Sequence, residues 1–405
     1  MKTILFSICL SISMTYSLSA QNNLRILEEI GFENLAEIQD GDHYYLSYEN
    51  NRYRYEGDAL IAVLEALELS VQTVKVSVLI LNRGIGMTSV FFDALDLKEL
   101  KRGELSADLF AEKSTFSFSV DALTAKFETL EKTNSSYLKV ETIVGLNLDY
   151  ALGNFDNSIR QKLNFQPELL SVIGKGAVVS GRYNFPTFNE IDQDVQRLQM
   201  ARLTQDIRWK DNVFLNLNFG FFSANRYGFS SRIDRYLGSE RLKIRFDFGI
   251  TRGLSLDENF QIKIQNNINT FNMAAGVNYR WNKYNTDISF RYGSYLLGDT
   301  GYKASLKRQF DEVFIGLFVN KTNFGQIAGF DFQIPLSFKR HMKNNGFRVR
   351  TKDFFYLDYN YRYDSALAAE YFQGSSVLSQ IREYYPNVLR EKVKRYFSKK
   401  QKAAN

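Results

Sequence analysis

Few side chains in this chain have the types and spacing that catalysis requires. Its 405 residues include two histidines, His43 and His341, which lie far apart in the sequence. Neither has a cysteine or a second histidine at the spacing of metal ligands, and no Gly-x-Ser-x-Gly motif of a nucleophilic serine occurs. His341 belongs to the basic segment Lys339–Lys343, which we expect to be an exposed loop. The sequence therefore predicts a protein that is not an enzyme and has no catalytic residue, metal site or cofactor.

Charged residues of another kind alternate with apolar residues between Val140 and Asp364. In the clearest segment, Lys243, Arg245 and Asp247 are interleaved with leucine, isoleucine and phenylalanine. A strand turns successive side chains to opposite faces, so one face of this segment is apolar and the other is charged.

The alternation recurs about fourteen times, in segments of roughly ten residues separated by short polar breaks. Transmembrane β-barrels need this pattern in every strand, at about 9 to 11 residues per crossing. We therefore predict a mainly β protein in which residues 140–364 form a transmembrane antiparallel β-barrel of about 12 to 16 strands, with 12 or 14 preferred. The pattern slips between Arg197 and Trp209, where we expect a β-bulge.

The composition agrees with such a barrel. The chain has 24 Tyr and 34 Phe, which can form aromatic girdles, and 4 Pro, which cannot donate to a strand ladder. Its mean hydropathy of −0.29 is low, as expected when polar residues fill every second strand position. No stretch reaches about 18 consecutive apolar residues, so no transmembrane helix is predicted.

If the apolar positions face lipid, the opposite positions line the barrel interior, because charges cannot cheaply face hydrocarbon. One interpretation is a basic path for an anionic glycan, with guanidinium groups contacting carboxylates. The other is an interior packed with ion pairs, as in any barrel of this size. Basic residues outnumber acidic ones by seven to three among the lumen-lining candidates, which are Arg182, Lys243, Arg245, Asp247, Lys263, Arg280, Asp287, Arg291, Asp358 and Arg362.

Residues 1–20 have the features of a secretory signal peptide. Lys2 supplies the positive charge, Ile4–Tyr16 is a short apolar run, and small residues precede Gln21. The single cysteine, Cys9, lies within this signal, so we expect no disulfide or thiol chemistry in the mature chain. Export disfavours nucleic acid as a partner, despite a pI near 9.0.

Residues 21–104 are expected to form a small α/β domain. Helices are predicted over Leu24–Ile38, with Gly31 weakening its middle, and over Gly57–Leu69 and Leu95–Arg102. Strands are predicted over His43–Glu49, Val74–Leu81 and Met87–Asp93. Residues 105–139 are uncertain: Phe116, Phe118 and Val120 alternate, which suggests one or two strands that would be the first of the barrel.

Residues 365–405 are predicted to form a helical, basic tail in which Pro386 breaks the helical spacing. From Arg382 to Asn405, eight basic residues stand against two acidic ones, a surplus equal to the whole net charge of +6. The basic pI is therefore a property of the tail and not of the barrel. This tail is either a surface for anionic lipid headgroups or acidic polymer, or a solvated, partly disordered end.

Two stretches carry motifs of a known family. The first, Tyr48–Arg54, reads Tyr-Glu-Asn-Asn-Arg-Tyr-Arg and precedes the Ala59-Leu60 helix and a strand ending in Gly84-Ile85-Gly86. The second, Tyr295–Gly301, reads Tyr-Leu-Leu-Gly-Asp-Thr-Gly and continues through Leu306–Phe310 to Gly329–Leu336. In order and spacing they resemble the YjbH family of exopolysaccharide-associated outer-membrane proteins, which includes the GfcD-like proteins of capsule systems.

The resemblance covers the chain from Glu37 to Phe338. It implies a β-barrel linked to small α/β domains, a role in surface polysaccharide production, and no established catalytic residues. Longer members of the family look like tandem arrangements, whereas this chain has room for one barrel and one α/β domain. Any function that needs two barrels is therefore not expected here.

The motif residues Arg52, Tyr53 and Arg54 either position the following helix or form a docking surface for a periplasmic partner. The preferred function is an outer-membrane accessory in the assembly or export of exopolysaccharide or capsule in a Gram-negative bacterium, with both ends of the chain in the periplasm. A passive porin-like channel and a structural barrel subunit of a larger outer-membrane complex are the alternatives. Expected partners are outer-membrane lipid, an anionic polysaccharide, and periplasmic or outer-membrane export proteins, but not nucleic acid.

Overall fold

The computed structural model describes residues 22–152, 159–191, 195–223, 225–256, 261–362, 369–370 and 376–404, which form two compact units. Unit 1 contains the chain up to Ser136, the segment Lys339–Lys343 and the C-terminal part from Ser379 onward. Unit 2 contains Tyr137–Phe338 and Asn344–Leu378. The predicted signal peptide, residues 1–20, lies outside the described residues.

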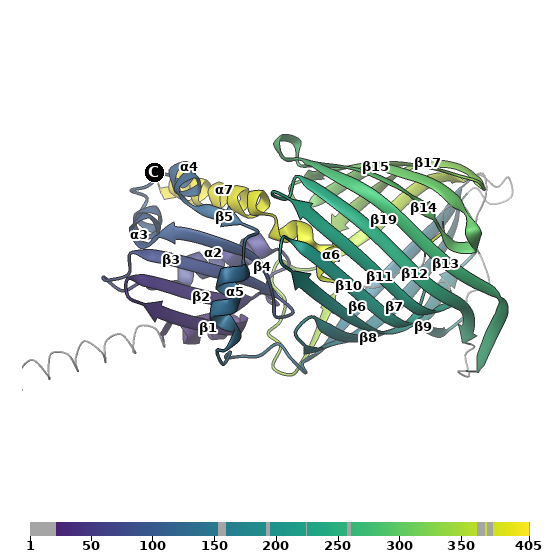
Figure 1. Cartoon of the computed structure of the whole chain (residues 1–405), viewed down its shortest axis with the longest axis horizontal. Helices are drawn as coiled ribbons and strands as arrows, with labels where there is room; N and C mark the ends of the chain where they lie inside the picture. Colours follow the sequence, from purple (N-terminus) through teal and green to yellow (C-terminus); the bar gives the residue numbers. More distant parts are fainter. Residues whose placement is uncertain are drawn as a thin grey trace, which may run out of the picture. The chain divides into compact units, whose positions relative to one another are not determined.

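Unit 1 is built on a five-stranded sheet in the order β1-β2-β3-β4-β5 (Figure 1). β2 and β3 pair in parallel, and the other neighbours pair antiparallel. The strands are β1 (Glu33–Asp40), β2 (His43–Glu49), β3 (Lys75–Asn82), β4 (Ile85–Asp93) and β5 (Thr115–Ser117); the helices are α2 (Glu56–Ala66), α3 (Ala94–Arg102), α4 (Ala107–Lys113), α5 (Asp121–Glu128) and α7 (Pro386–Ala404), with a 3-10 turn η3 (Ile381–Tyr384). The elements β2, β3, β4, α2 and α3 lie close to their predicted positions.

The first helix of unit 1 is shorter than predicted. Residues 22–30 are helical, but β1 begins at Glu33, so the prediction of one helix over Leu24–Ile38 is wrong. Gly31 has a φ of +107°, and the N–H groups of Gly31 and Phe32 donate to the carbonyl of Leu27 at 3.1 and 3.0 Å. Glycine ends helices in this left-handed conformation because it has no Cβ. Gly31 therefore stops the helix instead of weakening its middle.

The uncertain segment 105–139 lies mostly in unit 1, where it forms α4, β5 and α5. β5 pairs with β4, so the alternation at Phe116 adds an edge strand to the small sheet. The suggestion that it begins a barrel is wrong. The reason is tertiary: Phe116 and Phe118 are 6% and 3% exposed, and Phe118 packs edge-on against Tyr385 at 5.9 Å, a partner that no local pattern reveals.

The basic C-terminal segment is an ordered part of unit 1. α7 begins at Pro386, which suits the first turn of a helix because the missing N–H needs no partner there. Leu389, Val393 and Phe397 are at most 1% exposed and form one apolar stripe where α7 packs on α2 and α4. Tyr385, between η3 and α7, has an extended backbone, so the predicted break of the helical spacing at Pro386 is confirmed. The interpretation of the basic segment as a solvated, disordered end is wrong. Three of its cations form ion pairs within unit 1: Lys392–Asp58 at 3.2 Å, Lys394–Asp108 at 2.5 Å and Lys400–Glu65 at 2.9 Å.

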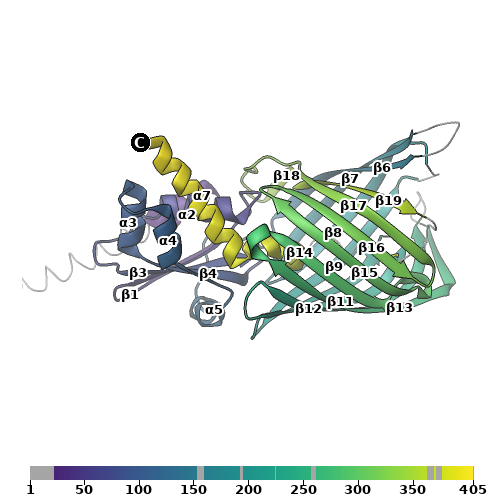
Figure 2. The ribbon, with the colours of Figure 1, turned by 90° about the horizontal axis from the view of Figure 1, so that it is seen from above.

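Unit 2 contains one sheet of fourteen labelled strands, consistent with the expected range of 12 to 16. From β6 to β17, each strand pairs antiparallel with the next one in the chain (Figures 1 and 2). The strands are β6 (Val140–Leu152), β7 (Ile159–Gly174), β8 (Ala177–Asn189), β9 (Arg197–Trp209), β10 (Val213–Phe222), β11 (Arg226–Leu237), β12 (Leu242–Leu256), β13 (Ile262–Trp281), β14 (Thr286–Ser294), β15 (Thr300–Phe310), β16 (Val313–Thr322), β17 (Gly325–Pro335), β18 (Phe347–Thr351) and β19 (Phe354–Arg362). The turns η1 (Asn282–Tyr284) and η2 (Leu296–Gly298) lie between strands, and α6 (Val377–Gln380) leads from unit 2 into unit 1.

The irregularity predicted in β9 is confirmed. Arg182 of β8 pairs with Met200, whereas the next residue, Tyr183, pairs with Leu198. One residue of β9 therefore has no partner in β8, which is the geometry of a β-bulge.

The first and last strands of the large sheet are brought together by one continuous stretch of chain. β18 pairs in parallel with β6, and β19, which is separated from β18 by two residues, pairs antiparallel with β17. The N–H of Lys352 donates to the carbonyl of Val144 at 3.0 Å, and the hydroxyl of Tyr150 donates to the carbonyl of Asp358 at 3.1 Å. In the order of the sheet, β18 lies beside β6 at one end and β19 lies beside β17 at the other.

The two faces of this sheet differ in polarity. We call the face that carries Lys243, Arg245 and Asp247 the polar face, and the opposite face, which carries Phe246 and Ile250, the apolar face. Asp247 is 5% exposed, whereas Phe246 and Ile250 are 38% and 55% exposed. The strands run side by side around a common axis in Figure 2. Side chains that point toward this axis are shielded from solvent by the surrounding strands, so we infer that the buried polar face is the inner one.

Candidate functional site: the polar face of the large sheet

The polar face contains many buried groups that hydrogen bond. Thr204, Ser230, Asp234 and Arg280 are 0% exposed. Neighbouring strands contribute side chains that reach one another, as in the chain from Asp206 through Asn216 to Asn218, with contacts of 2.7 and 2.6 Å. Buried polar groups need such partners, because an unpaired one costs about 1–3 kcal/mol.

Charged side chains of this face form ion pairs with side chains of adjacent strands. Arg182 donates to Glu168 at 2.5 Å, and Arg280 donates to Asp287 at 3.1 Å. The Asp234 carboxylate lies 3.0 Å from the Arg245 guanidinium and 3.4 Å from the Lys243 ammonium. Removing one partner of such a buried pair costs roughly 3–5 kcal/mol, because the remaining charge is left uncompensated.

Asp247 and Glu370 extend this network across β11, β12, β14 and β15. Asp247 lies 2.8 Å from Arg232 and 3.5 Å from Arg291. The same Arg291 lies 2.7 Å from Glu370, whose other oxygen lies 2.7 Å from Lys303. Glu370 is not in a strand: it comes from the part of the chain that follows β19.

Most of the predicted lumen-lining residues are therefore on the polar face and engaged in ion pairs. This holds for Arg182, Lys243, Arg245, Asp247, Arg280, Asp287 and Arg291. Asp358 is half-buried in β19, and Lys263, near the start of β13, is exposed. Only the backbone of Arg362 is described, and its side chain lies outside the described residues.

Sequence reasoning missed the carboxylates that neutralise the cations: Glu141, Glu168, Asp234, Asp331 and Glu370. The spacing of two residues between Asp234 and Arg232 in β11 could have shown that both side chains lie on the same face. No local signal identified Glu370, because its partners lie on two other strands.

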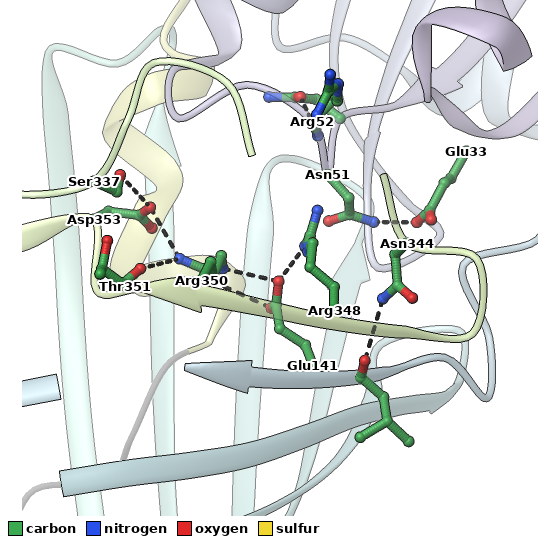
Figure 3. A network of polar contacts seen from close by, with 12 residues as sticks. Glu33, Asn51, Arg52, Glu141, Ser337, Asn344, Arg348, Arg350, Thr351 and Asp353 are labelled. Atoms are coloured by element: carbon green, nitrogen blue, oxygen red, sulfur yellow. Dashed lines mark hydrogen bonds and ion pairs between the residues drawn. The ribbon is translucent and has the colours of Figure 1, made fainter. Parts of the chain in front are cut away.

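Glu141 joins the first strand to the last segment of the sheet. Figure 3 shows its carboxylate accepting from Arg348 and Arg350 of β18, and the contact from Arg350 Nε measures 2.8 Å. Arg350 also donates to Asp353 at 2.9 Å, and Asp353 accepts from Ser337 at 3.2 Å. These charge-assisted bonds fasten β18 to β6 where the sheet has its parallel pair.

The predicted docking residues in unit 1 are largely covered by another part of the chain. Tyr53 and Arg54 are each 8% exposed, and Arg52 is half-buried. Tyr53 forms an isolated β-bridge with Arg340, whose guanidinium lies 5.0 Å from the Tyr53 ring. Little of Tyr53 and Arg54 is therefore open to a partner, because the segment Lys339–Lys343 contacts Tyr53. Beside them, Asn51 donates to Glu33 at 2.5 Å (Figure 3).

The two histidines lie in separate surroundings in unit 1. His341 is 8% exposed, so the prediction of an exposed loop is wrong; its N–H donates to the carbonyl of Arg52 at 2.7 Å. His43 lies 2.6 Å from the Ser77 hydroxyl and stacks on Tyr45 at 4.1 Å. Within the described ranges no group of three His, Cys, Asp or Glu side chains has the arrangement of a metal site.

Unit 1 contains a fully buried acid. Glu56 is 0% exposed and accepts from the Tyr48 hydroxyl at 2.7 Å. Burial raises the pKa of Glu56 to about 8, and the hydrogen bond from Tyr48 offsets only part of this effect. Burial likewise raises the pKa of Glu37 to about 7, although Tyr44 donates to it at 2.5 Å. Because the Glu56 carboxyl and the Tyr48 ring have no exposed surface, this pair is structural and not a substrate site.

Among the helices that the structure describes, none has both the length and the apolar character of a membrane-spanning helix.

Comparisons with known proteins do not identify the chain. No protein-family model and no curated protein matches it. Similar solved structures include a substituted variant of the Rh. blastica porin, with 7% identity over 49% of this chain and 78% of that one and a TM-score of 0.28. They also include a loop-deletion mutant of OmpT, an outer membrane protein of Vibrio cholerae, with 8% identity over 48% of this chain and 88% of that one and a TM-score of 0.30. Scores this low carry no argument, so the interpretation of unit 2 depends on its own chemistry.

Proposed function

We propose that unit 2 is an outer-membrane β-barrel and that the protein is an accessory in the assembly or export of an exopolysaccharide or capsule. The observation that carries the barrel is the inverted polarity of the large sheet. Its apolar face is exposed and its charged face is buried, the reverse of the arrangement that water favours. A surrounding bilayer explains this arrangement, because lipid covers the exposed apolar face and the polar groups of the interior hydrogen bond with one another.

The geometry of the strands supports the same conclusion. Those from β6 to β17 have 9 to 20 residues, and roughly 9 to 11 tilted residues cross a bilayer. The parallel pairing of β18 with β6, and the Tyr150–Asp358 contact, bring the ends of the sheet together. Such a meeting of edges is what a membrane requires, since an open sheet edge would leave backbone groups unsatisfied in lipid.

A pair of matched substitutions tests the barrel. Ile250 lies within β12 and Ile262 begins β13; both are on the surface, 55% and 63% exposed. For a water-soluble sheet, a lysine at either position would be harmless. For a barrel, we expect Ile250→Lys to cost about 2–4 kcal/mol of folding free energy in lipid vesicles, and Ile262→Lys about 0–1 kcal/mol. Equal, negligible costs at both positions would refute the membrane assignment.

The polysaccharide role is supported by the resemblance to the YjbH family and by the chemistry of the polar face. This face carries guanidinium groups of the kind that bind sugar carboxylates, although in this structure they pair with carboxylates of the chain itself. In this proposal unit 1, which includes the C-terminal helix α7, lies in the periplasm and is available to export proteins there. Outer-membrane lipid is then the partner of the apolar face.

A passive porin is a weaker candidate because residues after β19 lie on the polar face. Glu370 contacts Arg291 and Lys303, and the N–H of Val377 donates to Asp206 at 3.1 Å. A porin interior would be expected to be free of such chain. The third candidate, a structural barrel subunit of a larger complex, predicts that surface glycan is unaffected when the protein is absent.

Deletion of the gene, scored by capsule or matrix staining, tests the proposed role. We expect loss of the stained glycan and its return when the intact chain is supplied in trans. Normal glycan in the deletion strain would refute the accessory role and favour the structural subunit. A planar-bilayer recording of the purified protein addresses the porin: we expect no steady conductance, and a stable open channel would favour the porin instead.

A further inference from the structure

The first five residues of the motif Tyr295–Gly301 form a tight turn between β14 and β15, and its last two residues begin β15. Leu297 and Gly298 have φ values of +61° and +77°, both left-handed. The N–H of Tyr295 donates to the carbonyl of Asp299 at 2.7 Å, and the fully buried Asp299 carboxylate accepts from the N–H of Phe324 at 3.2 Å. A leucine in the left-handed region is costly, so the turn is kept in this shape by its surroundings.

This turn binds the part of the chain that follows β19. The N–H of Leu296 donates to the carbonyl of Ala369 at 3.1 Å. Ala369 also packs on an apolar cluster of Leu296 and Phe222, which are 6% and 0% exposed. Phe222 ends β10 and Leu296 follows the end of β14, and these two strands run in the same direction, so both residues lie at the same end of the sheet.

The next residue, Glu370, occupies a site made by two cations. Arg291 of β14 and Lys303 of β15 are directly opposite each other in the strand register, on the polar face. Like charges in directly opposed positions are destabilising unless an anion lies between them. The two Glu370 oxygens fill that role, each at 2.7 Å from one cation. Asp247, the other carboxylate at Arg291, is 3.5 Å away and is shared with Arg232.

Tyr295 completes the site. Its ring lies 4.4 Å from the Lys303 ammonium and 5.9 Å from the Arg291 guanidinium. The residue is 2% exposed, yet its hydroxyl has no hydrogen-bond partner among the described residues. Buried hydroxyls usually have a partner, so this one is a spare donor beside a carboxylate. The family motif therefore supplies both the turn that binds Ala369 and a wall of the anion site.

We propose that Arg291, Lys303 and Tyr295 form a carboxylate-binding site for an anionic polysaccharide, and that Glu370 occupies this site as an internal substitute when no glycan is bound. The choice of a uronate-bearing polymer rests on the proposed function. Its carboxylate has the charge and shape of the Glu370 side chain, so exchange leaves the charge of the site unchanged. No covalent bond is made or broken in this exchange. The ligand displaces Glu370 and thereby weakens the contact of the adjacent Ala369 with Leu296.

The test compares oligogalacturonate binding to the purified full-length protein and to Glu370→Gln, by calorimetry in detergent. Removing the internal competitor raises the fraction of protein with a free site, so we expect binding to tighten roughly tenfold or more. Arg291→Gln combined with Glu370→Gln should abolish it. Arg308→Gln combined with Glu370→Gln is the matched control, because Arg308 lies on β15 but faces outward and is exposed. The uncharged oligomer maltoheptaose should not bind any variant.

A covalent lock gives a second, independent readout. Leu296 and Ala369 are hydrogen-bonded neighbours, and Cys9 in the predicted signal is the chain's only cysteine. In Leu296→Cys/Ala369→Cys we expect no oligogalacturonate binding when oxidised and wild-type binding when reduced. This variant retains Glu370, so it tests whether release of the segment at Ala369 is needed for binding even if Glu370→Gln fails to fold. Folding of each variant is judged by its migration in unheated gels.

The outcomes separate this proposal from the accessory function. No gain in affinity in folded Glu370→Gln, or equal binding of galacturonate and maltoheptaose oligomers, overturns the carboxylate site whatever the deletion strain shows. Galacturonate binding that depends on Arg291 and is suppressed by Glu370 supports the site even if the deletion strain makes normal glycan. In that case the accessory function is refuted and the carboxylate site is not.

Discussion

Replacing the buried acid Glu56 by glutamine should change how the stability of unit 1 depends on pH. In the folded chain burial raises the pKa of Glu56 to about 8, whereas the ordinary value is 4.5. A raised carboxyl pKa means that the folded state holds a proton which the unfolded state releases. The contribution of Glu56 is therefore most favourable below about pH 4.5 and declines until the pH passes about 8.

The magnitude follows from the pH interval. Each pH unit between the unfolded and folded pKa values removes about 1.4 kcal/mol of unfolding free energy. Between pH 5 and pH 8 the wild-type chain should therefore lose about 4 kcal/mol through Glu56. Glutamine retains an acceptor for the Tyr48 hydroxyl and has no proton to lose, so Glu56→Gln should remove this part of the pH dependence. The part due to Glu37, whose pKa is raised to about 7, should remain.

Hydrogen exchange of the β2, β3 and β4 amides in the full-length protein measures this effect, after correction for the intrinsic pH dependence of exchange. Tryptophan fluorescence would not report on it, because both tryptophans, Trp209 and Trp281, are in unit 2. Glu29→Gln is the control: its side chain is 67% exposed, and the wild-type pH dependence should persist. The reasoning is refuted if Glu56→Gln keeps the full wild-type slope, or if the wild-type chain is more stable at pH 8 than at pH 5.

Two further predictions concern the ways in which distant segments are joined. Glu141→Gln removes the carboxylate shared by Arg348 and Arg350 and should destabilise the β6–β18 pairing by roughly 3–5 kcal/mol. This should lower the temperature at which the folded form is lost in detergent gels. The control Asp311→Asn changes an exposed turn residue and should not lower this temperature. Equal temperatures for the two variants would contradict the role of Glu141 in joining β18 to β6. Gly57→Val should displace α7, because a Cβ at position 57 would lie 2.6 Å from Lys392 Cγ. We expect faster hydrogen exchange throughout α7 than in the control Ala62→Val, a half-buried position of the same helix, and unchanged α7 protection would show that the two helices do not pack as described.

Much of the fold was predictable because its signals are local. The period-2 alternation at Lys243, Arg245 and Asp247 assigns each residue to a face of its strand without knowledge of any neighbour. The bulge near Gln199 was visible for the same reason, as an interruption of the period. Helix α2 and strand β2 were found in unit 1 by their own apolar spacing.

The errors share a physical cause, which is dependence on a distant partner. Phe116 and Phe118 alternate like barrel residues, but burial against the C-terminal part of the chain places them in unit 1. The basic C-terminal segment was read as a solvated end, because its apolar stripe has a partner only where α7 packs on α2 and α4. His341 was expected in an exposed loop, yet it is buried where its segment meets the distant segment that contains Tyr53.

The sequence by itself determined that this chain has a large alternating sheet with one charged and one apolar face, since strand geometry converts residue order directly into faces. Only the tertiary structure decided how the charges are balanced. Asp234, Glu168 and Glu370 neutralise the cations of the polar face from other strands or from the chain beyond β19, at separations that no local pattern encodes. It also decided that the last strand position pairs in parallel with the first, because the direction of β18 depends on how many strands precede it.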